Sequence, residues 1–222
     1  MNASFQINPS QFSSEQLTKL PAMCALVGHL MKEPCYDQLR TKEQLGYMVW
    51  SGASRTCGIY SIWFIVQSPE KGPAFLDNRC ENFIENFYTI LKEMTAETFQ
   101  SNIQACVLTR TKKDVSLYSQ AGRYWKEIED NAYVFNRKFK TAETLKTVTK
   151  EDVMSLFENH IKSDGKYRSK ISSHIVGKDK SEVDDVLFAA QVEQGTVLVG
   201  DNTSAMDDFK RGCALYPTVK RK

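Results

Sequence analysis

Two consecutive strand-like segments, residues 46–54 and 58–68, constrain the fold of this chain more than any other feature. Both are rich in β-branched and aromatic residues, and the short connection between them ends in Gly58, which predicts a β-hairpin. The second segment carries apolar residues on both faces: Ile59, Trp63 and Ile65 on one, and Tyr60, Ile62, Phe64 and Val66 on the other. A strand of this kind is usually central in its sheet and covered on both sides.

The segment before the hairpin predicts a short strand followed by a long helix. Apolar and polar residues alternate over 4–8, and Ser13 with Gln16 has the spacing of a capping box. The helix that follows would bury a stripe at three- and four-residue intervals: Leu17, Leu20, Cys24, Val27 and Met31. We expect Pro21 to kink this helix or delay its start, and Pro34 to break it.

After the hairpin the apolar period becomes helical. Helices are expected over 73–94, 95–108, 117–130, 142–147 and 151–161, and a strand over 170–176. Because helices follow helices, a regular βαβ winding does not fit. The order predicts an α+β fold, a two-layer sandwich with a mainly antiparallel sheet and helices packed on one face. We place the α+β core in residues 1–177 and treat 178–222 as a C-terminal extension that packs back on the same domain, with no convincing period up to Arg211.

Composition excludes several classes of function. The 222 residues carry a net charge of +2, which is too near balance to indicate nucleic-acid binding. No apolar run is long enough to span a bilayer, and the N-terminus shows no secretory signal. The six cysteines are scattered and form no CxxC pair, which predicts free, mostly buried thiols in a reducing compartment. We therefore expect a cytoplasmic protein.

The histidines do not predict a metal site. His29, His160 and His174 lie outside any HxxEH or HExxH sequence, the spacings that bring two imidazoles and a carboxylate to zinc from one helix. We expect no metal and no cofactor on this chain. A Cys–His nucleophile pair is not excluded, although nothing singles one out, and buried structural cysteines are the simpler interpretation.

The most informative stretch is residues 33–52, which pass from a helix through Gly46 into a strand. Arg40 offers a planar fork of donors that suits a carboxylate or a peptide carbonyl, and Tyr47 offers a phenolic O–H at the start of a strand. Two such donors could stabilise a developing oxyanion if they converge. The alternative is that Arg40 pairs with Asp37 or Glu43 on the helix surface and that Tyr47 packs in the hairpin.

Residues 33–47, EPCYDQLRTKEQLGY, resemble the C-terminal domain of the insulysin and pitrilysin family of zinc metallopeptidases. Weaker matches to that family follow in the same order along nearly the whole chain, at residues 58–68, 93–99, 124–128, 145–152 and 209–217. The resemblance implies one of four homologous α+β domains that enclose a chamber in two bowl-like halves. In the family, zinc is bound by an inverted HxxEH motif of the N-terminal domain, which this chain lacks.

The resemblance also implies a function. The last domain of the family supplies an arginine and a tyrosine that contact the substrate near the scissile bond, and these correspond to Arg40 and Tyr47. The expected partners are a zinc-bearing N-terminal half, peptide substrates and, as an open question, a second copy of the chain; neither nucleic acid nor membrane is expected. We expect the chain to be inactive by itself, as a fragment of a longer polypeptide or as a separate subunit.

Two other interpretations remain open. One is a catalytically silent scaffold of the processing-peptidase type. The other is a polyanion-binding module, which would require two basic clusters to converge on one face: Lys112 and Lys113, and Arg137, Lys138 and Lys140. An aromatic set could line a peptide-accepting surface, with a core or interdomain contact as the alternative: Tyr118, Tyr124, Trp125, Tyr133 and Phe135.

Overall fold

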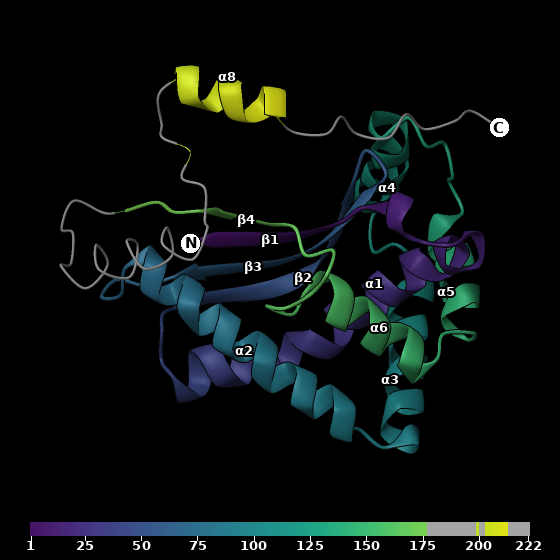
Figure 1. The fold of residues 1–222 in the computed structure, drawn as a ribbon. Coiled ribbons are helices and arrows are strands. Elements are labelled where there is room, and N and C mark those ends of the chain that lie inside the picture. The colour runs from purple at the N-terminus through teal and green to yellow at the C-terminus, as the bar shows by residue number, and fades with distance from the viewer. Residues whose placement is uncertain (177–198, 200–202, 213–222) are drawn as a thin grey trace.

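The computed structural model describes residues 1–176, 199 and 203–212, and these form an α+β sandwich (Figure 1). Four strands make one antiparallel sheet in the order β2-β3-β1-β4: β1 (Asn2–Ile7), β2 (Met48–Thr56), β3 (Ile59–Gln67) and β4 (Lys170–Ser173). The helices α1, α2, α3, α5 and α6 lie together on one side of this sheet. The predicted fold class, with helices packed on one face, is confirmed.

The β2–β3 hairpin is confirmed, and the geometry of its turn explains why Gly58 occurs there. Cys57 and Gly58 both have positive φ angles, 49° and 87°, as a two-residue type I′ turn requires. β3 is central, as predicted, and its face with Ile62, Phe64 and Val66 is buried. The prediction that both faces of β3 are covered was wrong for the described residues, since Trp63 and Ile65 on the other face are only half-buried.

The long helix α1 (Ser14–Cys35) begins as predicted, with Ser13 and Gln16 forming both bonds of the capping box. The predicted break at Pro34 was wrong, because α1 runs through both prolines and continues directly into a π-helical segment, η2 (Tyr36–Lys42). A proline removes one backbone hydrogen bond and crowds the preceding turn. The buried face of α1 holds the helix against the sheet, and this packing offsets the cost of the two prolines.

Five of the remaining helices follow the predicted order with shifted ends, whereas η1 and α8 were not predicted. The remaining helices are η1 (Pro9–Gln11), α2 (Pro73–Glu93), α3 (Ala96–Thr111), α4 (Leu117–Glu129), α5 (Arg137–Leu145), α6 (Lys150–His160) and α8 (Thr203–Gly212). α5 begins at Arg137, earlier than expected. α8 was missed, because its ten residues are too few to establish a hydrophobic period. It lies apart from the other helices, on the far side of β4 (Figure 1).

A chain of aromatic rings joins the sheet to the helical layer. Phe5 and Phe64 meet at a centroid distance of 5.9 Å, Phe64 meets Phe83 at 5.9 Å, and Phe87 meets Phe157 at 5.4 Å. Their buried rings connect β1 and β3 to α2 and then to α6. Such aromatic pairs add stability beyond their buried area, so the sheet and the helices are firmly registered against each other.

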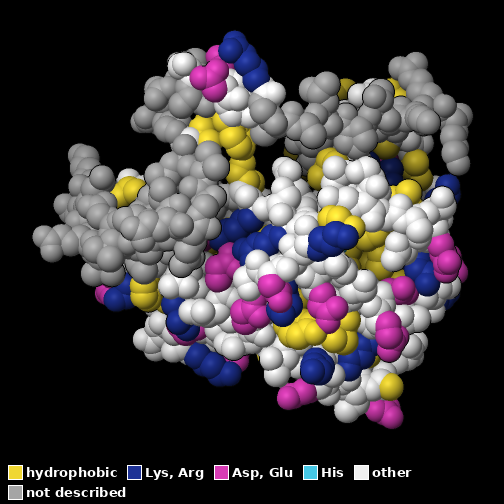
Figure 2. Space-filling view, in the orientation of Figure 1, with side chains coloured by type: hydrophobic (Ala, Val, Ile, Leu, Met, Phe, Trp, Pro, Cys, Tyr) yellow, Lys and Arg dark blue, Asp and Glu magenta, His cyan; other side chains and the backbone are white. Residues whose placement is uncertain are grey.

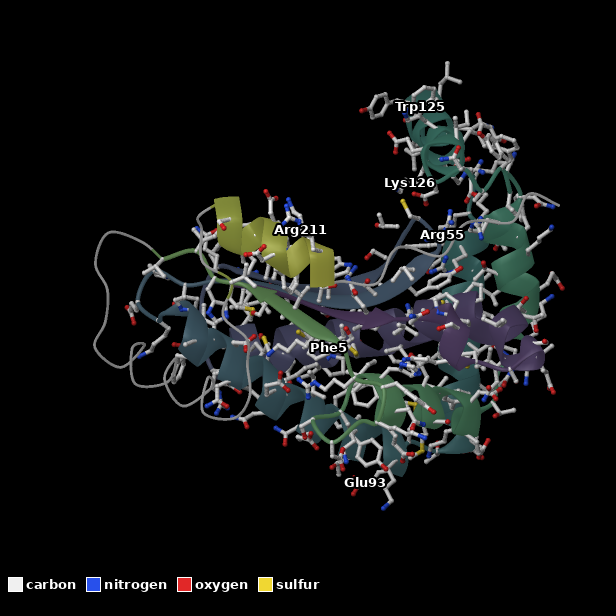
Figure 3. All side chains as sticks on the ribbon, turned by 45° about the horizontal axis from the view of Figure 1, so that its top comes forward. Phe5, Arg55, Glu93, Trp125, Lys126 and Arg211 are labelled. Atoms are coloured by element: carbon white, nitrogen blue, oxygen red, sulfur yellow. The ribbon has the colours of Figure 1, made fainter. Side chains whose placement is uncertain are left out.

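Buried ion pairs fix α4 to the end of the hairpin. Glu127 accepts two hydrogen bonds from Arg137, at 2.5 and 2.8 Å, and lies 3.3 Å from Arg55 on β2. Arg55 also pairs with Asp130 at 3.0 Å. Figure 3 shows Arg55 at the end of the hairpin and Trp125 on α4. Buried carboxylates paired with two arginines lose much stability when one partner is removed, so this network holds α4 in place.

Candidate functional site

The candidate site is built on η2, where the helix widens into π geometry. The backbone N–H of Glu43 donates to the carbonyl of Gln38 at 2.9 Å, and that of Leu45 donates to the carbonyl of Leu39 at 3.0 Å. Leu39 and Leu45 are buried and anchor the segment in the core. Single-turn π segments are frequent at functional sites because they rotate side chains out of the regular helical pattern.

Arg40 lies among aromatic groups. Its guanidinium carbon is 4.9 Å from the ring centroid of Tyr36 and 4.9 Å from that of Tyr47, and its Nη1 donates a hydrogen bond to the Tyr36 hydroxyl. A guanidinium within about 6 Å of an aromatic ring is attracted by the ring quadrupole. Arg40 and Tyr47 are therefore brought together, which their spacing in the sequence did not establish.

The alternative pairing of Arg40 on the helix surface was wrong. Asp37 pairs instead with Lys42 at 2.7 Å, and Glu43 pairs with Arg79 of α2 at 2.7 Å. Within residues 1–176, no carboxylate lies at ion-pair distance from Arg40. The guanidinium keeps its formal charge and several N–H donors for a group outside the chain.

Tyr47 projects from the site, and the backbone beneath it is closely packed. Its side chain is 82% exposed, so it does not pack in the hairpin. Gln44 has a positive φ of 51°, and the backbone at Gly46 presses against β3. A Cβ atom at Gly46 would lie 1.9 Å from the carbonyl oxygen of Gln67. Glycine is thus the residue type that lets this loop approach the sheet and present Tyr47.

Glu43 is the main acidic group of the site. It accepts two hydrogen bonds from Arg79, at 2.7 and 2.8 Å, and one from Gln38 at 2.9 Å. Burial would raise the pKa of Glu43, but these hydrogen bonds and the charge of Arg79 outweigh it and hold the pKa below its usual value. The carboxylate is therefore ionised at neutral pH and fully engaged, which leaves it no role as a general base.

The described residues do not fit a zinc ion. No group of three His, Cys, Asp or Glu side chains that could hold a metal occurs in residues 1–176, 199 and 203–212. His29, His160 and His174 lie on α1, at the end of α6 and after β4, so they come from separate elements. No step of any reaction can therefore be assigned to a metal held by this part of the chain.

Cysteine chemistry is also disfavoured. The five described cysteines are free, and four of them are buried, which confirms the thiol prediction for that part of the chain. Burial raises the pKa of Cys35 to about 11, despite a hydrogen bond with Ser51 that acts in the opposite direction. A thiol protonated at neutral pH is a poor nucleophile. Cys213 lies outside the described residues.

The aromatic set on and after α4 is exposed, so the core alternative for it was wrong. Tyr118 and Trp125 are among the most exposed large apolar side chains of the described chain. The basic clusters adjoin, because Lys138 donates to the carbonyl of Lys112 at 3.1 Å. Lys138 also pairs with Asp114, and Arg137 pairs with Glu127, so part of the positive charge is neutralised internally. On the face shown in Figure 2, basic and acidic side chains are intermixed.

Sequence reasoning missed Tyr36, whose hydroxyl and ring both contact Arg40. A signal was present, because Tyr36 precedes Arg40 by four residues, the spacing that places two side chains on one face of a helix. It missed Arg79 as well, which no local pattern could have linked to Glu43 across 36 residues.

Comparisons with known proteins show which family this chain resembles. Residues 26–125 match the family model described as PQQ synthase PqqF-like, C-terminal lobe domain 4. Human insulin-degrading enzyme is 37% identical over 197 residues, which cover 86% of this chain and 19% of that protein. The A-factor-processing enzyme of Saccharomyces cerevisiae is 33% identical over 166 residues, which cover 75% of this chain and 16% of that protein. The nardilysin-like protein of Arabidopsis thaliana is 30% identical over 215 residues, which cover 97% of this chain and 20% of that protein.

The solved structures agree on the fold. The crystal structure of pitrilysin superposes with a TM-score of 0.61 at 24% identity, over 72% of this chain and 17% of that one. The chain thus spans about a fifth of the length of the relatives that it matches. Within the described residues, no helix is long and apolar enough to cross a membrane. The chain belongs to the M16 family of insulin-degrading enzyme and pitrilysin, and it corresponds to a C-terminal domain of that family.

Proposed function

We propose that this chain is the substrate-binding and transition-state-assisting domain of an insulysin-like zinc metalloendopeptidase that degrades peptides. The observation that carries the proposal is the position of Arg40 beside Tyr47, with the charge of Arg40 unpaired within residues 1–176 and the ring of Tyr47 exposed. Another domain would hold the zinc ion, which would supply polarisation of the peptide carbonyl and activation of the attacking water. We place this activity in the cytoplasm, where the free thiols would stay reduced.

The residues of this chain would act by hydrogen bonding. The guanidinium of Arg40 and the hydroxyl of Tyr47 would donate to the carbonyl oxygen of the scissile peptide, or to the oxyanion that forms there. Tyr36 orients the guanidinium through its hydroxyl. Because the donors are held by a π-helical turn and a packed glycine, little reorganisation is needed when charge develops on the substrate.

The half-exposed face of the sheet supports a peptide-binding role. Trp50 on β2 is exposed, its cross-strand neighbour Ile65 is half-buried, and the Trp63 ring lies over Gly52. Apolar surface of this kind commonly marks a binding face. In this proposal, the apolar surface on β2 and β3 accepts apolar side chains of the peptide. β2 begins at Met48, directly after Tyr47, so this surface adjoins the candidate site.

The test is Arg40→Ala in the assembled peptidase, with the zinc-bearing half supplied in the same polypeptide or in trans. We expect kcat to fall by roughly 100-fold or more, with a smaller change in KM. Lys42→Ala is the matched control, since Lys42 is a cation of the same segment whose charge is paired with Asp37. An Arg40→Ala enzyme with unchanged kcat would overturn the proposal and would favour the scaffold alternative.

A further inference from the structure

We infer that Glu43 is a positioning residue: its bidentate ion pair with Arg79 of α2 holds η2 in the conformation that presents Arg40 and Tyr47. The inference deepens the proposed function and rests on it. Arg40 and Tyr47 would touch the substrate, whereas Glu43 would act only through them.

The first support is the place of Glu43 in the chain. It directly follows η2, and its own N–H closes the last π-type hydrogen bond of that segment, to Gln38. The next residue, Gln44, has a positive φ of 51°, so the helical path ends immediately after Glu43. Glu43 therefore stands at the junction between the segment that carries Arg40 and the loop that carries Tyr47.

The second support is the number of bonds that converge on this carboxylate. Oε2 accepts from Arg79 Nε at 2.7 Å, and Oε1 accepts from Arg79 Nη2 at 2.8 Å and from Gln38 Nε2 at 2.9 Å. Gln38 in turn accepts a hydrogen bond from Asn86 at 3.3 Å. Two residues of α2 thus bind the segment, so η2 is fixed to a helix that belongs to the packed core.

The third support is the difference between the apolar and the polar anchors of the segment. Leu39 and Leu45 are buried and hold the segment in the core. Hydrophobic contacts are non-directional, so they do not fix how the exposed side of the segment is oriented. A bidentate arginine–carboxylate pair has a fixed planar geometry and therefore fixes orientation as well as position. Loss of the pair would let the segment rotate about its leucines and move Arg40 away from Tyr47.

The experiment is a double-mutant cycle in the assembled peptidase. Glu43→Gln keeps the side-chain volume and removes the charge, and we expect kcat to fall by roughly 10- to 100-fold with little change in KM. In an Arg40→Ala background the same substitution should lower kcat by a smaller factor, because Arg40, one of the two groups through which Glu43 acts, is absent. Equal losses in the two backgrounds would overturn the inference, as would a wild-type kcat for Glu43→Gln.

Glu81→Gln is the matched control. Glu81 is an acidic residue of α2 that accepts hydrogen bonds from Arg168 at 2.5 Å and from Lys170 of β4 at 2.6 Å, and neither partner belongs to η2. The Glu81→Gln substitution should leave kcat unchanged even if it lowers the melting temperature. A second variant, Arg79→Lys, keeps the charge but loses the fork, and it should reproduce the kcat loss of Glu43→Gln. Loss of kcat in Glu81→Gln, or full activity in Arg79→Lys, would count against positioning.

Hydrogen exchange of the 222-residue chain separates failure of this inference from failure of the proposed function. Glu43→Gln should accelerate exchange at the amides of Glu43 and Leu45 by about tenfold, while exchange in β3 stays unchanged. If Arg40→Ala alone leaves kcat intact, the proposed function fails, and exchange still decides whether Glu43 anchors the segment. If Arg40→Ala abolishes activity but Glu43→Gln alters neither exchange nor kcat, only the positioning role is refuted.

Discussion

The guanidinium carbon of Arg40 lies 4.9 Å from the ring centroid of Tyr47, although the first belongs to a π-helical turn and the second precedes a strand. The chain achieves this within seven residues by ending the helix in π geometry and pressing Gly46 against β3. The proposed function requires more of this pair, namely that the guanidinium and the phenol both donate to one acceptor on the substrate.

Tyr47→Phe removes the phenolic donor and keeps the ring that contacts Arg40. In the assembled peptidase we expect kcat to fall by roughly 100-fold, which corresponds to about 3 kcal/mol of transition-state stabilisation. KM should change far less, because the ring and its contact with Arg40 remain. Steady-state kinetics on a fluorogenic peptide would measure both. Wild-type kcat in Tyr47→Phe would refute the donor role.

Gly46→Ala tests the close approach of the loop to the sheet. The added Cβ would lie 1.9 Å from the Gln67 carbonyl oxygen, so the backbone must shift. We expect the free energy of unfolding to fall by at least about 1–3 kcal/mol, as for overpacking of a core. Gly122→Ala is the control, because Gly122 lies in α4 with open space around it and alanine favours a helix there. Urea denaturation of both variants should give shifts of opposite sign.

The purified chain should show no chelator-sensitive peptidase activity. The described residues contain no cluster able to hold a metal, and the proposed mechanism places zinc on another domain. A fluorogenic peptide incubated with the chain, with and without a chelator, would test this. Activity should appear only when the zinc-bearing half is added. Cleavage by the pure chain that a chelator abolishes would overturn the expectation.

Much of the fold could be predicted from the sequence because its signals are local. The capping box of Ser13 and Gln16 and the turn at Gly58 act within a few residues, and both were predicted. The path beyond Pro34 was not, since the stability of a helix through proline depends on tertiary packing.

The candidate site shows the same limit. The motif around Arg40 and Tyr47 is local, but the contact between them depends on the path of the loop through Gly46. The bond from Arg79 to Glu43 joins residues that only the fold brings together. Likewise, nothing in the spacing of His160 indicated that its ring would stack on Phe12.

Glu127→Gln should detach α4 from the hairpin. Glu127 is buried and binds Arg137 and Arg55, so loss of its charge leaves Arg137 without its ion-pair partner and removes one of the two carboxylate partners of Arg55. Because Arg55 keeps its pair with Asp130, the cost comes mainly from Arg137, and we expect the free energy of unfolding to fall by roughly 3 kcal/mol. Glu143→Gln is the matched control, because its pair with Lys146 is exposed and should contribute less than about 1 kcal/mol. Equal effects of the two substitutions would show that the buried network does not hold the helix.

His160 should make the chain less stable in mild acid. Its ring is buried between Phe12 and Tyr167, and burial lowers its pKa below the usual value of 6.5. The unfolded chain therefore takes up a proton at higher pH than the folded chain does. Stability is complete above about pH 6.5 and is lost as the pH falls toward the lowered pKa, with a slope of at most about 1.4 kcal/mol per pH unit for one proton.

His160→Phe should remove much of that slope while keeping the aromatic stack. Because the buried Nδ1 of His160 has no hydrogen-bond partner in the described part of the chain, the substitution should cost little stability at pH 7.5. His29 also has a lowered pKa, caused first by burial and then by the charges of Lys32 and Arg110, so some slope should persist in His160→Phe. Urea unfolding at several values between pH 5 and 8 measures the difference. A slope that His160→Phe leaves unchanged would show that this histidine does not titrate between the folded and unfolded states.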